Sequence, residues 1–137
     1  MLNNINSKSQ TLNSKQYQNS NDQNNKHYDL EERTYIFAKN IREYVKKLPR
    51  SISNIEYTKQ LIRSSASIAA NYIEANESLS KKDFFMRIKI SRKEAKETRL
   101  WINLTEPLNE NIKDQNKLIQ EVTELSKIFG SIVTKNN

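Results

Sequence analysis

The sequence predicts an all-α protein, an antiparallel up-down-up-down four-helix bundle preceded by a disordered N-terminal arm. Two observations support this fold class. The 137 residues include only one glycine and two prolines, whereas a β-rich chain of this length needs many tight turns that rely on these residues. From Asp29 onward, apolar residues recur at steps of three and four, the period of an amphipathic helix. A chain of this length has room for one domain.

The first 28 residues differ in composition from the rest of the chain. Asn, Ser, Gln and Lys dominate them, and apolar residues are too sparse to form a helix face. Such a segment cannot bury enough surface to offset the entropy lost on ordering. Residues 1–28 are therefore predicted to be a disordered arm, and residues 29–137 the bundle. The simpler interpretation of the arm is a solvated tail, and the alternative is a flexible arm that touches nucleic acid.

The first two helices are expected at about residues 30–48 and 54–76. Asp29 followed by Glu32 resembles a capping box, and Pro49 ends the first helix. The first apolar stripe consists of Leu30, Phe37, Ala38, Ile41, Val45 and Leu48. The second is assigned to Ile55, Ile62, Ala66, Ala69 and Ile73, flanked by Leu61, Ser65, Ile68 and Tyr72. Small side chains between residues 64 and 70 predict a close helix crossing.

The third and fourth helices are expected at about residues 81–106 and 114–133. Ser80 and Asp83 mark the start of the third helix. Its core seam consists of Phe84, Ile88, Ser91, Ala95, Thr98 and Ile102, and the fourth stripe of Leu118, Val122, Leu125, Phe129 and Ile132, with Gly130 tolerated near the end. On the third helix, Met86, Ile90 and Trp101 fall well away from the seam. A helix that is apolar on two sides predicts self-association through these three residues.

Several classes of function are excluded by the residues that the sequence lacks. There is no cysteine, and the lone His27 lies in the arm, so no histidine-dependent triad can form in the bundle. Glu74 and Glu94 could suggest acid–base or metal chemistry, but the Glu-x-x-His pairs of di-metal bundles are missing. We therefore expect a protein that is not an enzyme and uses no cofactor or metal. The amino terminus has no apolar run typical of a signal peptide, and no 18-residue apolar stretch occurs, so a cytoplasmic location is expected.

The excess of positive charge is concentrated in the third helix. The chain has a net charge of +7, and residues 81–99 alone carry eight basic and three acidic side chains, or +5. On a helical wheel, one face of this segment collects Lys89, Arg92, Lys93, Lys96 and Arg99, with Lys82 nearby. This face could lie along a phosphate backbone, and the simpler alternative is a solvated helix face. Aromatic residues are not interleaved with these cations, so base-specific recognition is not expected.

A second set of polar residues lies beside the apolar seams of the second and third helices. We expect these side chains to satisfy one another through ion pairs and hydrogen bonds, either between the two helices or between subunits. This predicted network consists of Arg63, Asn71, Glu74, Arg87 and Glu94, with Ser67 on the same stripe.

Several ordered segments together resemble one bacterial family, the four-helix-bundle proteins named after the intervening sequences of 23S rRNA genes. The segments that match are 30–34, 59–65, 71–75, 80–84, 86–90 and 92–99. The resemblance covers residues 29–106, and the last helix only in its apolar pattern. It implies a bundle that assembles into a ring, typically a homopentamer. The accessory variability determinant of diversity-generating retroelements is similar in fold, and it binds nucleic acid together with a reverse transcriptase.

Charge and resemblance together favour a non-enzymatic, oligomeric, basic scaffold that contacts nucleic acid, with RNA favoured, through its third helix. The alternative is a protein–protein adaptor that docks onto a larger nucleic-acid-processing partner, such as a reverse transcriptase or a ribosome-associated factor. The resemblance itself transfers no established activity to this chain.

Overall fold

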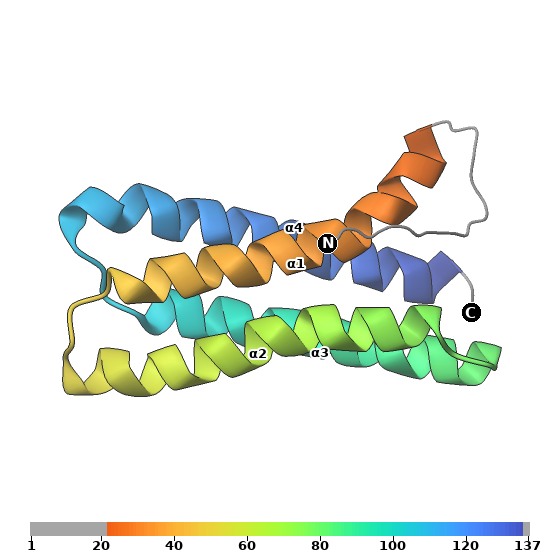
Figure 1. The fold of residues 1–137 in the computed structure, drawn as a ribbon, viewed down its shortest axis with the longest axis horizontal. Coiled ribbons are helices and arrows are strands. Elements are labelled where there is room, and N and C mark those ends of the chain that lie inside the picture. Colours follow the sequence, from red (N-terminus) through yellow and green to blue (C-terminus); the bar gives the residue numbers. More distant parts are fainter. Residues whose placement is uncertain (1–21, 136–137) are drawn as a thin grey trace, which may run out of the picture. The chain divides into compact units, whose positions relative to one another are not determined.

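The computed structural model describes residues 22–135, and their side chains from Leu30 onward. They form helices α1 (Asp22–Lys46), α2 (Ile52–Asn76), α3 (Lys81–Leu104) and α4 (Ile112–Lys135), with a short 3₁₀ turn, η2 (Asn109–Asn111), before α4 (Figure 1). The described residues contain no strand, so the predicted all-α class is confirmed. None of these helices is long and apolar enough to cross a membrane.

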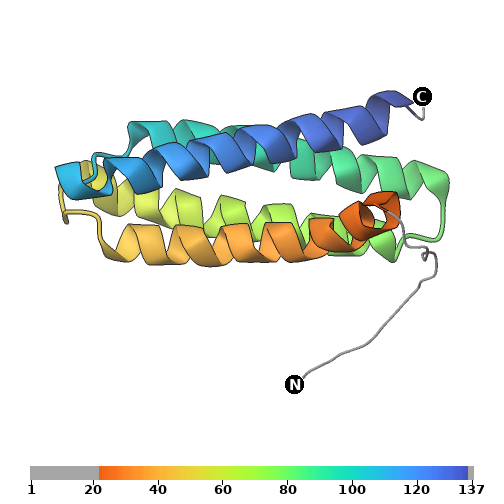
Figure 2. The same ribbon diagram turned by 90° about the horizontal axis from the view of Figure 1, so that it is seen from above.

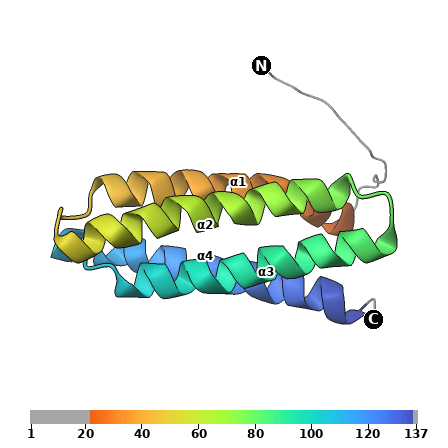
Figure 3. The same ribbon diagram turned by 90° about the horizontal axis from the view of Figure 1, so that it is seen from below.

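The chain divides into two compact units, with the boundary between Arg33 and Thr34 inside α1. In the unit that begins at Thr34, successive helices run antiparallel, in the predicted up-down-up-down order (Figures 1 and 2). Helix α3 packs against both α2 and α4, and α1 lies beside α2 (Figure 3). An ion pair of 3.0 Å between Lys47 and Asp114 joins the end of α1 to α4.

The first helix begins earlier than the apolar pattern predicts. The structure starts α1 at Asp22 rather than near residue 30, because the Asp29–Glu32 signal lies inside a continuous helix and no proline or glycine interrupts residues 22–30. Residues 1–21 of the predicted arm lie outside the described residues. The other boundaries agree with prediction within a few residues, and the Ser80 side chain caps α3 by accepting a hydrogen bond from the Asp83 N–H.

The core of the bundle confirms most of the predicted stripes of α3 and α4 and corrects that of α2. At the end of α4, Val133 is buried rather than the predicted Ile132, because the core face continues four residues after Phe129, and Phe84 at the start of α3 is only half-buried. Ile88, Ala95 and Ile102 are fully buried, as are Val122 and Phe129. In α2 the side chains that point inward are Leu61, Ser64, Ser65, Ile68, Tyr72 and Ala75.

The stripe assigned to α2 from sequence was therefore wrong. Ile62 and Ile73 are 41% and 49% exposed, and the flanking residues Leu61, Ile68 and Tyr72 form the true core face. Two apolar stripes lie about a quarter-turn apart on this helix, and periodicity alone does not decide which of them faces inward. The consequence is an apolar strip on the outside of α2.

One end of the bundle is held by the buried side chain of Asn54. Its Nδ2 donates to the carbonyl oxygens of Pro49 (2.9 Å) and Glu106 (3.1 Å), and its Oδ1 accepts from the Glu106 N–H (3.0 Å). The α1–α2 and α3–α4 connections are thereby joined. Burial raises the pKa of the nearby Tyr44 phenol, whose oxygen lies 2.9 Å from Thr105 Oγ1.

We predict that Asn54→Ala lowers the free energy of unfolding by about 2–4 kcal/mol, because three part-buried hydrogen bonds to the backbone of Pro49 and Glu106 are lost. Urea denaturation followed by circular dichroism measures this loss. Asn103→Ala is the matched control, since the exposed Asn103 amide bonds only to the Arg99 carbonyl of its own helix. An equal loss in both variants would contradict the assigned role of Asn54.

Candidate nucleic-acid interface

A groove runs between α3 and α4 on the outside of the bundle. Its volume is about 740 Å³. Five cationic side chains line it, and no carboxylate does. Hydroxyl side chains fill the spaces between the cations. The lining consists of Arg92, Lys96 and Arg99 from α3, and Lys127, Lys135, Thr123, Ser126, Ser131, Thr134 and Gly130 from α4, with Ala95 and Val122 at its base.

The five cations of the groove are not neutralised by the protein. Over residues 30–135, no hydrogen bond or ion pair engages the side chains of Arg92, Lys96, Arg99, Lys127 or Lys135. The cations that do form ion pairs lie elsewhere, on α1, α2 and the α2-facing side of α3. Five unpaired like charges along one groove attract anions and repel one another, and a bound phosphate relieves that repulsion.

The structure divides the six cations predicted from sequence into two groups. Arg92, Lys96 and Arg99 line the groove, whereas Lys82, Lys89 and Lys93 are exposed on α3 outside it. The α4 half of the groove was missed, because Lys127 and Lys135 look like the ordinary solvated face of an amphipathic helix. Only the packing of α4 beside α3 shows that they join the same surface.

The only glycine of the chain, Gly130, lies in this groove beneath Arg92. A Cβ atom placed on Gly130 would be 3.3 Å from Arg92 Nε, 3.5 Å from Cζ and 3.7 Å from Nη2. The guanidinium therefore rests on the bare backbone of α4. Sequence reasoning treated this glycine only as a tolerated residue near the helix end.

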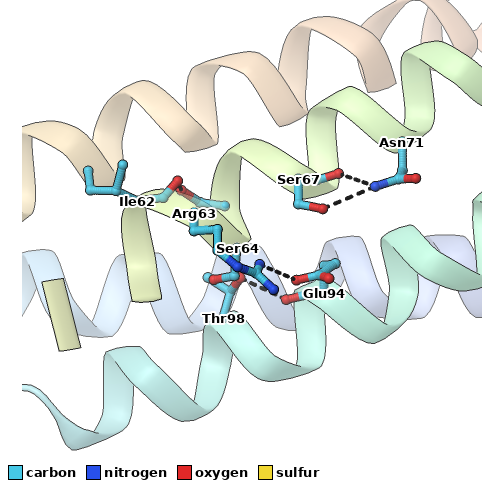
Figure 4. Close-up of polar contacts among 8 residues, drawn as sticks. Ile62, Arg63, Ser64, Ser67, Asn71, Glu94 and Thr98 are labelled. Atoms are coloured by element: carbon cyan, nitrogen blue, oxygen red, sulfur yellow. Dashed lines mark hydrogen bonds and ion pairs between the residues drawn. The ribbon is translucent and has the colours of Figure 1, made fainter. Parts of the chain in front are cut away.

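A second polar region, the α2–α3 seam, lies where these two helices meet (Figure 4). Arg87 donates to Asn71 Oδ1 at 3.0 Å and forms an ion pair of 3.0 Å with Glu74. Asn71 Nδ2 in turn donates to the backbone oxygen (2.9 Å) and the hydroxyl (3.0 Å) of Ser67. Four of the residues expected in a polar network are thus joined within one chain.

The remaining pair of side chains predicted for this seam, Arg63 and Glu94, lies at a longer distance. Glu94 is 5% exposed, and its Oε1 lies 3.7 Å from Arg63 Nη1, too far for a hydrogen bond. That oxygen has no hydrogen-bond partner in the described part of the chain. No group of three potential metal ligands occurs among the described residues. The seam thus places Glu94 beside a single cation.

Buried hydroxyls fix the distance between α2 and α3. Thr98 Oγ1 lies 2.7 Å from Ser64 Oγ and 2.7 Å from the Glu94 carbonyl oxygen, and Ser91 donates to the Ile68 carbonyl at 3.0 Å. These side chains are small and almost completely buried. The close crossing predicted from the small residues of α2 is built on these contacts.

The comparison with known proteins decides the family. The family model of the 23S rRNA-intervening sequence protein matches residues 26–131. The chain belongs to this family. A solved structure from Bacteroides thetaiotaomicron, described as a protein with unknown function from the S23 ribosomal protein family, is similar to it, with 29% sequence identity and a TM-score of 0.65. The similarity covers 76% of this chain and 97% of that one. No curated protein matches the sequence.

The three residues predicted for self-association lie in different surroundings. Met86 is 46% exposed. Ile90 and Trp101 are half-buried, and the Trp101 ring stacks on Tyr57 of α2 with 6.1 Å between ring centroids. Part of Trp101 is thus covered within one chain, and Met86 is the most exposed of the three.

For the α2–α3 seam, we predict that the effects of two substitutions on stability are not additive. Thr98→Val leaves the buried Ser64 hydroxyl without its side-chain partner and should lower the free energy of unfolding by about 1–3 kcal/mol. Adding Ser64→Ala should recover at least half of that loss, because removing both partners leaves no unsatisfied group. Thr123→Val, which removes a hydroxyl bonded only within its own helix, should change stability by less than about 0.5 kcal/mol. Urea denaturation of the unchanged protein, Thr98→Val, Ser64→Ala, the double variant and Thr123→Val gives these values, and strictly additive losses at positions 64 and 98 would contradict the assignment.

Proposed function

We propose that this protein is a non-enzymatic, self-associating scaffold that binds the backbone of nucleic acid, with RNA as the favoured ligand, in the α3–α4 groove. The observation that carries the proposal is the row of five unpaired cations along a groove without a carboxylate. Lys and Arg side chains bind phosphate through counterion release and charge-assisted hydrogen bonds.

The chemistry of the groove favours binding to the backbone over reading of the bases. Its polar side chains are cations and hydroxyls, which are the groups that contact phosphate and sugar oxygens. The lining includes no aromatic ring on which a base could stack and no asparagine or glutamine that could read a base edge. We therefore expect weak dependence on sequence and strong dependence on salt.

Self-association is the second part of the proposal. The exposed apolar side chains Ile62 and Ile73 on α2 and Met86 on α3 support it, since large apolar patches on a single chain commonly mark contact surfaces. A ring, with the homopentamer implied by the family resemblance as its expected form, would repeat the basic groove around its circumference. Several grooves on one strand would raise the apparent affinity through high effective concentration.

A protein–protein adaptor is the second candidate, and the same apolar strip of α2 is the observation that favours it. In that case, the strip would be covered by a larger partner rather than by another copy. Recovery of a partner from the cell that survives nuclease treatment would favour the adaptor, and loss of all partners on nuclease treatment would favour direct binding to nucleic acid.

We predict that Lys127→Glu weakens binding to single-stranded RNA and reduces the slope of log affinity against log salt by about 0.7 or more, because each phosphate contact contributes that amount. Fluorescence anisotropy at several salt concentrations measures the slope. Lys113→Glu is the matched control, since it reverses the same charge on the same helix outside the groove. Undetectable binding of the unchanged protein at low salt, or equal effects of the two variants, would refute the proposal.

We also predict that the unchanged chain is larger than a monomer in solution, and that Ile73→Glu with Met86→Glu reduces its size. Charges placed on these exposed positions make burial in a subunit contact unfavourable without disturbing the core. Light scattering coupled to size-exclusion chromatography measures the mass. Leu108→Glu, at a similarly exposed site in the α3–α4 connection, should leave the mass unchanged, and a monomeric unchanged protein would contradict self-association.

A further inference from the structure

We propose that the middle of the α3–α4 groove is a phosphate-binding site in which Gly130 is a positioning residue for Arg92. The inference rests on the proposed binding of nucleic acid and deepens it. The contact is made by the Arg92 guanidinium, its ligand is a phosphate group, and Gly130 holds the guanidinium in place.

The backbone of Gly130 does not itself require a glycine. Gly130 lies inside α4 with ordinary helical geometry, five residues before the helix ends. Its φ does not fall in the left-handed region that favours glycine. In such a position, glycine destabilises a helix relative to alanine, because it loses more conformational freedom on folding. The reason for a glycine must therefore come from its surroundings.

The side chain nearest to the missing Cβ of Gly130 is that of Arg92. Small residues often serve to let two helix backbones approach closely, but the three atoms nearest to a Cβ on Gly130 all belong to the Arg92 guanidinium. Its shortest approach, 3.3 Å, is tighter than ordinary van der Waals contact. The missing side chain thus leaves room for a guanidinium that crosses from α3 to α4.

Arg92 in this position keeps its hydrogen-bonding capacity available. Its side chain makes no ion pair or hydrogen bond with residues 30–135. A guanidinium carries five donors in a planar fork, a geometry suited to two phosphate oxygens at once. Ser126, Lys127 and Ser131 line the same stretch of α4, so further donors surround the position that a phosphate would occupy.

The ligand of this site is a phosphodiester of a nucleic-acid strand. A phosphate bound to Arg92 would also reduce the repulsion among Lys96, Arg99 and Lys127. Gly130 therefore sets where the guanidinium lies, and Arg92 makes the contact.

The test compares the full-length protein with Gly130→Ala, Arg92→Ala and the double variant. Arg92→Ala should lower the affinity for a single-stranded RNA about tenfold at low salt, because a charge-assisted contact is lost. Gly130→Ala should lower it severalfold while raising the melting temperature or leaving it unchanged. In the Arg92→Ala background, Gly130→Ala should have no further effect on affinity.

A second pair of substitutions distinguishes the positioning of Arg92 by Gly130 from a general change in the structure of α4. Gly130→Ala and Arg99→Ala should have additive effects on affinity, because no Arg99 atom is among the nearest neighbours of Gly130. Equal affinity of Gly130→Ala and the unchanged protein would overturn the inference, as would additivity of Gly130→Ala with Arg92→Ala. If the melting curve shows that Gly130→Ala is unfolded, Arg92→Lys tests the same contact: it keeps the charge but loses the planar fork, so it should lower the affinity severalfold, and an unchanged affinity would overturn the inference.

A second probe distinguishes failure of this site from failure of the proposed function. In an NMR titration with inorganic pyrophosphate, the Arg92 Nε–H resonance should shift in the unchanged protein and shift less in Gly130→Ala. RNA binding without any response of Arg92 would overturn the phosphate site and leave the proposed function standing. A response of Arg92 to pyrophosphate in a protein that binds no RNA would support the site and refute the function.

Discussion

The arrangement of the bundle depends on the close hydroxyl-lined packing of α3 against α2. Thr98 and Ser91 of α3 reach the Ser64 side chain and the Ile68 carbonyl of α2, and both side chains of α3 are fully buried. These contacts fix the rotation of α3 about its axis. Because each residue of a helix turns by about 100°, the neighbouring positions 92, 96 and 99 then point towards α4.

Much of the fold, but less of the site, could be predicted from the sequence. The number of helices, their order and most of the core faces of α3 and α4 follow from apolar periodicity and from Pro49. The core face of α2 does not, because Ile62 and Ile73 look as suitable for a core as Leu61 and Ile68. Which of two apolar stripes is buried is decided by partner helices, and a single helix contains no information about them.

The cations of the candidate site could likewise be predicted only in part from the sequence. Arg92, Lys96 and Arg99 could be found on a helical wheel because they cluster on one segment. Lys127 and Lys135 are separated in sequence from that cluster, and only the α3–α4 contact brings them to it. The role of Gly130 could not be predicted from the sequence, because the side chain that lies against it, Arg92, is almost forty residues away. A cluster of charges within one helix can thus be predicted from the sequence, whereas a groove formed by two helices becomes visible only in the structure.

The hydrogen bonds of Asn54 make the two ends of the bundle mechanically unequal. Around it, Gln115 donates to the carbonyls of Ile102 and Thr105, and Lys47 pairs with Asp114. At the opposite end, the Glu77–Ser80 turn makes local hydrogen bonds, such as that of the Ser78 hydroxyl to the Glu74 carbonyl, and α4 ends at Lys135, which lines the groove. Backbone amides near Asn54 should therefore exchange slowly with solvent deuterium, and those of the last turns of α4 rapidly. The groove includes Lys135 and so extends to the end of the bundle that Asn54 does not hold, where easier local opening would let its width adapt to what it binds.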